Sequence, residues 1–125
     1  MGTNDTLAVV RAYHRGWTSK QFKDATELLA ADLRVEVPIN SYPNRESFAQ
    51  ALISFGSLAT SVELIAEFGH ADEAMLLYDM EVDGLGPLRL AEHFTVADGQ
   101  ITRIRQIHDT AALRAAGFAQ SAPEA

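Results

Sequence analysis

Residues 89–109, RLAEHFTVADGQITRIRQIHD, have the pattern of two β-strands joined by a glycine turn. Apolar and polar residues alternate along both strands, so that Leu90, Phe94 and Ile104 fall on one face. The same alternation places three polar side chains on that face: Glu92, Gln106 and His108. Burying a carboxylate without partners is costly. This face therefore predicts a pocket rather than a packed core.

The length of the turn decides which side chains share the pocket, because a shift of one residue turns every side chain over. A loop of two residues would place Arg105 opposite Glu92 and leave the carboxylate on the solvated surface. A loop of three, residues 98–100, places Gln106 opposite Glu92. Apolar and charged residues separate better in the second register, which we adopt. The same pairing across the preceding DGLG turn places Tyr78 beside Glu92.

Outward from the hairpin, the pattern predicts helices interrupted by one strand, followed by an antiparallel meander. The alternation in SVELIAEF puts four apolar side chains inside, Val62, Leu64, Ala66 and Phe68, and places Glu63 and Glu67 outside. The first expected helix is capped by Thr3 or Asn4 and reaches Trp17, and its apolar side carries Leu7, Val10, Tyr13 or His14, and Trp17. A helix at 22–31, a strand at 33–37 and a loop at 39–44 follow. The next helix is capped by Asn44, and its apolar side carries Phe48, Ala51, Leu52 and Phe55. The meander then runs to His108, and a short helix capped by Asp109 and stopped by Gly117 comes last.

This order predicts an α+β domain in which the helices pack on one face of a curved sheet. We expect a single domain over residues 1–118 and a disordered C-terminal tail over residues 119–125. The outer face of the sheet carries mixed charges around apolar residues, which favours a homodimer through the sheet. These outer residues are Leu77, Asp79, Glu81, Arg89, Ala91, Arg103, Arg105 and Ile107.

Composition narrows the classes of function. The 125 residues are 47% hydrophobic with a formal net charge of −7, which argues against nucleic acid and anionic membrane surfaces as partners. The chain has no cysteine, and no stretch approaches the roughly 20 apolar residues of a membrane span. The four histidines show no metal-binding spacing. We therefore expect a cytoplasmic, soluble protein without a metal.

Four segments together resemble the nuclear transport factor 2-like superfamily, especially its SnoaL-like branch. They are RAYHRGW, ATELLAADLRVEVP, the helix after YPNRES, and AEHFTVADGQITRIRQIHD. The resemblance covers nearly the whole chain. It implies a cone-shaped, strongly bent antiparallel sheet with N-terminal helices that close an apolar cavity, of the cystatin-like α+β type. It also implies a dimer through the sheet and chemistry that needs no cofactor.

Two enzyme groups of this superfamily indicate which positions matter. The chain is similar to ketosteroid isomerases in the spacing from Tyr13 to Pro38, and Glu92 matches the acid that shares the oxyanion hole with that tyrosine. The base of those enzymes would lie at Val37, which cannot act as one. The final hairpin is similar to limonene epoxide hydrolases, whose catalytic aspartate matches Gln106. The resemblance to polyketide cyclases implies a cavity acid or base.

Three readings of the cavity follow. In the first, the chain is an acid–base enzyme of isomerase, cyclase or hydrolase type, in which Tyr13 and Glu92 hold or protonate a substrate oxygen and His108 is the base. In the second, the cavity binds a small hydrophobic ligand without turnover. In the third, the chain is a structural homodimer with an incidental cavity. The expected substrate-binding residues are Trp17, Val37, Phe55, Tyr78, Met80, Phe94, Ile104 and Gln106.

Overall fold

The computed structural model describes residues 3–38 and 40–117, which form four helices and six strands. The helices are α1 (Thr3–Thr18), α2 (Phe22–Glu27), α3 (Arg45–Gly56) and α4 (Ala111–Ala115). The strands are β1 (Leu29–Glu36), β2 (Ser41–Tyr42), β3 (Ala59–His70), β4 (Glu73–Val82), β5 (Gly86–Ala97) and β6 (Gln100–Ile107). The predicted tail at 119–125 lies outside the described residues.

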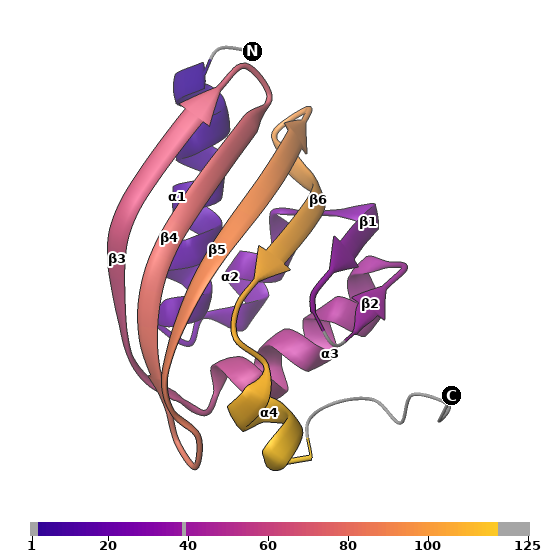
Figure 1. Cartoon of the computed structure of the whole chain (residues 1–125). Coiled ribbons are helices and arrows are strands. Elements are labelled where there is room, and N and C mark those ends of the chain that lie inside the picture. Colours follow the sequence, from indigo (N-terminus) through magenta and orange to yellow (C-terminus); the bar gives the residue numbers. More distant parts are fainter. Residues whose placement is uncertain (1–2, 39, 118–125) are drawn as a thin grey trace.

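The six strands make one sheet in the order β2-β1-β6-β5-β4-β3. Strands β3 to β6 form the predicted antiparallel meander, and the sheet curves around α1 (Figure 1). The predicted α+β cone is therefore confirmed. One pairing differs from the expectation of an antiparallel sheet, because β1 runs parallel to β6. None of the described helices has the length and apolar character needed to cross a membrane.

Helix α1 packs its predicted apolar side against the sheet, with Val10, Tyr13 and Trp17 all buried. Thr3 and Asn4 lie inside the helix rather than before it, so their predicted role as caps is wrong. A side chain on Gly16 would come within 3.1 Å of Ala25, which explains why glycine is suited to the crossing of α1 and α2.

The second helix is shorter than predicted, because α2 ends at Glu27 and the next residues join the sheet. Leu29 and Leu33 are fully buried in β1, and the Leu28 carbonyl accepts a hydrogen bond of 2.8 Å from the Ile101 amide of β6. Leu, Ala and Glu favour a helix locally. Here pairing with β6 and burial of these side chains outweigh that preference.

Strand β3 carries a bulge between Leu64 and Ala66, which the alternating sequence does not reveal. Leu64 pairs with Tyr78, but beyond the bulge the two faces exchange. Ala66 pairs with Leu77 on the outer side, and Phe68 is 71% exposed there, so the inward positions predicted for both are wrong. Glu67, predicted to face solvent, instead turns towards α1 and accepts two hydrogen bonds from the Arg11 guanidinium at 2.6 and 2.9 Å.

The predicted register of the β5–β6 hairpin is confirmed, but the turn that produces it differs from the predicted one. Glu92 lies opposite Gln106, as expected. The loop, however, has two residues: Asp98 and Gly99 both have positive φ, at 52° and 75°, as a tight hairpin turn requires. The extra residue lies in β6, where the pairing shifts and Thr102 forms a bulge. The bulge therefore restores the parity that the loop alone would have reversed.

Helix α3 closes one side of the cone and begins as predicted, since the Asn44 side chain accepts a hydrogen bond of 2.9 Å from the Ser47 amide. The predicted loop before it contains the short strand β2, which pairs with β1. At the C-terminus, Asp109 accepts a hydrogen bond of 2.9 Å from the Ala111 amide, although Thr110 occupies the cap position of α4. Gly117, with φ of 83°, follows this helix.

Candidate functional site

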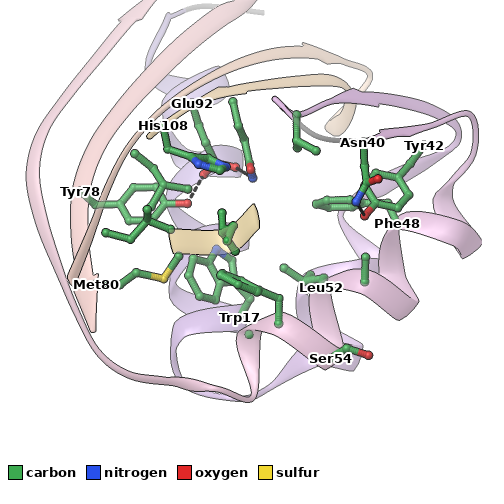
Figure 2. Close-up of a pocket in the computed structure, with 18 of the residues that line it drawn as sticks. Trp17, Asn40, Tyr42, Phe48, Leu52, Ser54, Tyr78, Met80, Glu92 and His108 are labelled. Atoms are coloured by element: carbon green, nitrogen blue, oxygen red, sulfur yellow. Dashed lines mark hydrogen bonds between the residues drawn. The ribbon is translucent and has the colours of Figure 1, made fainter. Parts of the chain in front are cut away.

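A cavity of about 250 Å³ lies between the inner face of the sheet, α1 and α3. Most of its wall is apolar, and its polar side chains come from α1, α3, the β1–β2 segment, β4, β5 and the end of β6 (Figure 2). The lining residues are Tyr13, Trp17, Val37, Asn40, Tyr42, Phe48, Ala51, Leu52, Ser54, Phe55, Gly56, Tyr78, Met80, Leu88, Leu90, Glu92, Gln106, His108 and Leu113. This combination of an apolar wall with a few polar groups is typical of a small-molecule site.

Glu92 is the acidic residue of this wall and is only 1% exposed. Each of its carboxyl oxygens accepts one hydrogen bond. The Tyr78 hydroxyl donates to Oε1 at 2.8 Å, and the Gln106 amide donates to Oε2 at 2.6 Å. The predicted grouping of these three side chains is present, and the carboxyl group is oriented from both neighbouring strands.

Burial raises the pKa of Glu92 from its ordinary value to about 7. The hydrogen bonds from Gln106 and Tyr78 act in the opposite direction, because both stabilise the carboxylate, but burial has the larger effect. Near neutral pH the neutral acid and the carboxylate are therefore both populated. Such a group can donate a proton to a ligand or accept one.

Tyr13 and Tyr78 lie in the same wall as Glu92, and both hydroxyl groups remain neutral. Burial, and then the charge of Glu92, raise the pKa of Tyr78 and of Tyr13 well above the ordinary value. The Tyr13 ring packs edge-on against Phe94 at 5.9 Å between ring centres, which fixes it on the floor of the cone. The predicted pairing of Tyr13 with Glu92 in one cavity is therefore present.

His108 follows the last residue of β6, and it lies on the same side of the cavity as Glu92 (Figure 2). Its Nδ1 is 3.0 Å from the Asp109 carbonyl oxygen. A carbonyl can only accept, so Nδ1 must carry the hydrogen in this contact. In the neutral ring, Nε2 is then the basic nitrogen, as a proton acceptor at this position requires.

The cavity wall includes most of the predicted substrate-binding residues. Trp17, Val37, Phe55, Tyr78, Met80 and Gln106 all line it. Phe94 and Ile104 do not: both are fully buried in the core behind the wall. They share the inner face of the sheet with Glu92, as predicted, but they lie nearer the β5–β6 turn, where the sheet is packed rather than open.

Sequence reasoning missed the part of the wall built by the β1–β2 segment, by α4 and, apart from Phe55, by α3. Phe48 and Leu52 were expected on the apolar side of the third helix, and that spacing was the available signal. Asn40 and Tyr42 come from a segment that looked like a loop, and nothing in the sequence marks them as lining residues. Leu113 of α4, only 4% exposed, closes the wall from the C-terminal side.

His14 supports the site from behind. It is 7% exposed, and its ring packs edge-on against Tyr78 at 4.7 Å and Trp17 at 5.5 Å between ring centres. Burial lowers the pKa of His14 to about 4, so the ring is neutral at physiological pH. His14 therefore helps to hold Tyr78 in place without adding a charge.

Within residues 3–38 and 40–117, no three histidine or acidic side chains are grouped so that they could hold a metal ion. The expectation that the site works without a metal or an organic cofactor stays a prediction. The groups at hand for chemistry are the carboxyl of Glu92, the imidazole of His108 and the tyrosine hydroxyls. They suit proton transfer to and from an oxygen-bearing ligand.

Comparison with known proteins agrees with this architecture. A solved protein from Kribbella flavida DSM 17836 is 30% identical over 90% of this chain and 93% of its own, with a TM-score of 0.84. A candidate ketosteroid isomerase from the same organism is 17% identical, with 98% and 85% coverage and a TM-score of 0.78. An LEH-like epoxide hydrolase from M. tuberculosis is 17% identical, with 90% and 89% coverage and a TM-score of 0.75.

The two less similar structures share the fold, and this likeness carries no conclusion about activity. No curated protein matches the sequence. The model of the SnoaL-like domain matches residues 10–104, which include all six strands except the last residues of β6. The resemblance stated from the sequence is confirmed, and this chain belongs to the SnoaL-like domain family.

Proposed function

We propose that the cavity binds a compact, mostly apolar molecule with a carbonyl or hydroxyl oxygen, and that Glu92 exchanges a proton with this oxygen. The observation that carries the proposal is a fully buried carboxyl group in an apolar wall, held by Tyr78 and Gln106, with its pKa near 7. A buried carboxyl group with a strongly raised pKa that also borders an open cavity is typical of a functional site.

The proposed step is an enolisation. His108 Nε2 takes a proton from the carbon next to the ligand carbonyl, and protonated Glu92 gives its proton to the carbonyl oxygen. The products are an enol, an imidazolium ion and a carboxylate. Return of a proton to carbon and of the hydroxyl proton to Glu92 regenerates both groups. Tyr13 would stabilise the developing negative charge on the oxygen by donating a hydrogen bond.

This assignment differs from the two enzyme groups that the sequence resembles. Val37 occupies the position of the isomerase base, and it lines the cavity without a titratable group. Gln106 occupies the position of the hydrolase aspartate, and it donates a hydrogen bond to Glu92. His108 would therefore supply the missing base from the end of β6, and the ligand must present its acidic carbon on that side.

A ketone that fills the cavity tests the proposal without knowledge of the natural substrate. With 4-cyclohexylcyclohexanone in D₂O, we expect the protein to accelerate deuterium exchange at the carbons next to the carbonyl, as followed by proton NMR. Glu92→Gln and His108→Gln should each reduce the acceleration at least tenfold. Lys23→Gln, a change on the exposed surface of α2, is the matched control and should leave it unchanged.

The same experiment separates the three readings of the cavity. Binding of the ketone without accelerated exchange would identify a binding module and overturn the enzymatic proposal. Neither binding nor exchange would leave the cavity without a ligand of this class and would favour the structural homodimer. Exchange that survives Glu92→Gln would remove Glu92 from the mechanism.

We also propose that a second copy of the chain covers the outer face of the sheet. A row of apolar residues crosses this face through four paired strands: Ala66, Leu77, Ala91 and Ile107. Ile107 is 72% exposed, and Phe68 and Met75 lie exposed on the next row. An apolar centre between charged rows suits a two-fold contact.

A cytoplasmic location stays a prediction.

A further inference from the structure

A second polar group lies in the cavity, on the wall that faces Glu92. Asn40 and Tyr42 come from the β1–β2 segment, and they stand across the open space from Glu92, Tyr78 and His108 (Figure 2). Between the two polar ends the wall is apolar, with Leu52 and Met80 among its side chains. The cavity therefore offers polar contacts at two opposite ends of one apolar chamber.

The backbone holds this second group in place. The Val37 amide donates to the Asn40 carbonyl oxygen at 3.0 Å, and the Asn40 amide donates back to the Val37 carbonyl oxygen at 3.3 Å. Tyr42 pairs with Val35 in the sheet, and its ring packs edge-on against Phe48 at 5.7 Å between ring centres. The turn is thus closed by its own main chain and leaves the Asn40 side chain for another role.

The Asn40 side chain has an unused acceptor. Its Nδ2 donates to the Tyr42 hydroxyl oxygen at 3.3 Å, a long contact for a hydrogen bond. Its Oδ1 is buried and has no partner among the residues that the structure describes. A buried carbonyl without a donor is destabilising, and buried polar groups at ligand sites are commonly satisfied by the ligand.

Charge indicates what kind of group would reach it. No lysine or arginine is among the lining residues, and the chain has a net charge of −7. An anionic end of a ligand would find no counter-charge there, whereas a neutral hydroxyl can donate to Oδ1 of Asn40. The terminal torsion of an asparagine side chain is soft, so the amide group can rotate to turn Oδ1 towards a ligand in the cavity.

We infer that the ligand carries two oxygen functions at opposite ends of a compact apolar skeleton: one at Glu92, and a hydroxyl that donates to Asn40 beside Tyr42. This inference rests on the proposed function for the oxygen at Glu92. It makes Asn40 a specificity-determining residue, and it defines the substrate class as hydroxylated carbonyl compounds rather than simple ketones or acids.

Three compounds of one shape test the two ends separately by calorimetry with the full-length protein. They are bicyclohexyl, 4-cyclohexylcyclohexanone and 4-(4-hydroxycyclohexyl)cyclohexanone. We expect the hydroxyketone to bind about tenfold more tightly than the ketone, the gain of one well-placed hydrogen bond. In Asn40→Leu this gain should disappear, while the ketone keeps its affinity. Tyr42→Phe, which retains the packing on Phe48, should reduce the gain only in part.

Each result has a distinct meaning. If the ketone binds more tightly than the hydrocarbon but the hydroxyl adds nothing, the inference fails and the proposed function stands. If the hydroxyl adds affinity through Asn40 but the ketone is no better than the hydrocarbon, the inference stands and the role of Glu92 fails. If none of the three binds, both fail. Should Asn40→Leu not fold, the comparison of the two ketones on the unaltered protein and on Tyr42→Phe still decides.

Discussion

Tyr78 and Glu92 are hydrogen-bonded although they do not face each other in the β4–β5 ladder. Leu76 lies opposite Glu92, and Tyr78 lies opposite Leu90, one step further along the inner face. The tyrosine reaches diagonally, and its hydroxyl arrives 2.8 Å from Oε1. This diagonal contact lets one strand supply the donor while the directly paired residues, Leu76 and Leu90, remain part of the apolar core.

Removal of this donor should make Glu92 a weaker acid. In Tyr78→Phe, we expect the pKa of Glu92 to rise from about 7 by roughly 1–2 pH units, because a hydrogen bond to a charged group contributes about 1.5–3 kcal/mol. Carbon-13 NMR of the glutamate carboxyl groups measures it. Tyr42→Phe removes a hydroxyl from the opposite wall and serves as the control. An unchanged pKa in Tyr78→Phe would mean that the diagonal bond does not form in solution.

The raised pKa also predicts a pH-dependent stability. Glu92 has an ordinary value of 4.5 and a folded value of about 7, so between these pH values the folded state binds more protons than the unfolded chain. Proton binding by Glu92 therefore stabilises the folded state fully below pH 4.5. About 3 kcal/mol of the free energy of unfolding is lost as the pH rises through 7. Glu92→Gln cannot titrate, so the free energy of unfolding should depend less on pH over this interval. Urea unfolding at pH 5 and pH 8 measures this for both proteins. If the free energy of unfolding changed by the same amount between these pH values in the unaltered protein and in Glu92→Gln, the prediction would be wrong.

The outer face of the sheet should control the oligomeric state. We expect light scattering to give twice the mass of the 13.6 kDa chain, and Ile107→Asp to give the single-chain mass, because a charge would be buried at the centre of the contact. Ile53, 45% exposed on α3, offers a matched control, since Ile53→Asp places the same charge away from the sheet. Salt should have little effect, because Arg89 is already paired with Asp79 within the chain at 2.6 and 2.8 Å.

The cap at the start of α3 should contribute to stability. Asn44→Ala removes the side chain that caps this helix, and we expect the free energy of unfolding to fall by about 1 kcal/mol. Asn44→Asp keeps an acceptor at the cap and should be nearly neutral. Thermal or urea unfolding measures both. If alanine and aspartate behaved alike, the cap would not contribute to stability.

The local spacing of apolar residues was sufficient to predict much of the fold and the centre of the site. Hydrophobic segregation selected the register that puts Glu92 opposite Gln106, because only that choice separates apolar from charged residues on β5 and β6. The helical spacing of Val10, Tyr13 and Trp17 likewise predicted the inner side of α1. Both are short-range regularities that a single buried face imposes on the chain.

What failed depends on contacts between distant segments. The end of α2 is set by pairing of β1 with β6, which lies far away in the sequence. The inward position predicted for Phe68 failed because a bulge leaves no mark on an alternating pattern. Asn40 was missed because two tertiary features place it in the cavity wall: its backbone hydrogen bonds with Val37 and the position of α3. Neither feature can be read from the local sequence of a loop.

The bulge at Thr102 has a consequence for comparing sequences within this family. A hairpin with one more residue in its loop and no bulge would bring the same side chains together, so the unpaired residue can move between loop and strand without moving the carboxyl group. Relatives that lack the bulge can then keep the acid and its partner at the same alignment positions. A different turn type in a relative therefore does not by itself signal a different arrangement of this site.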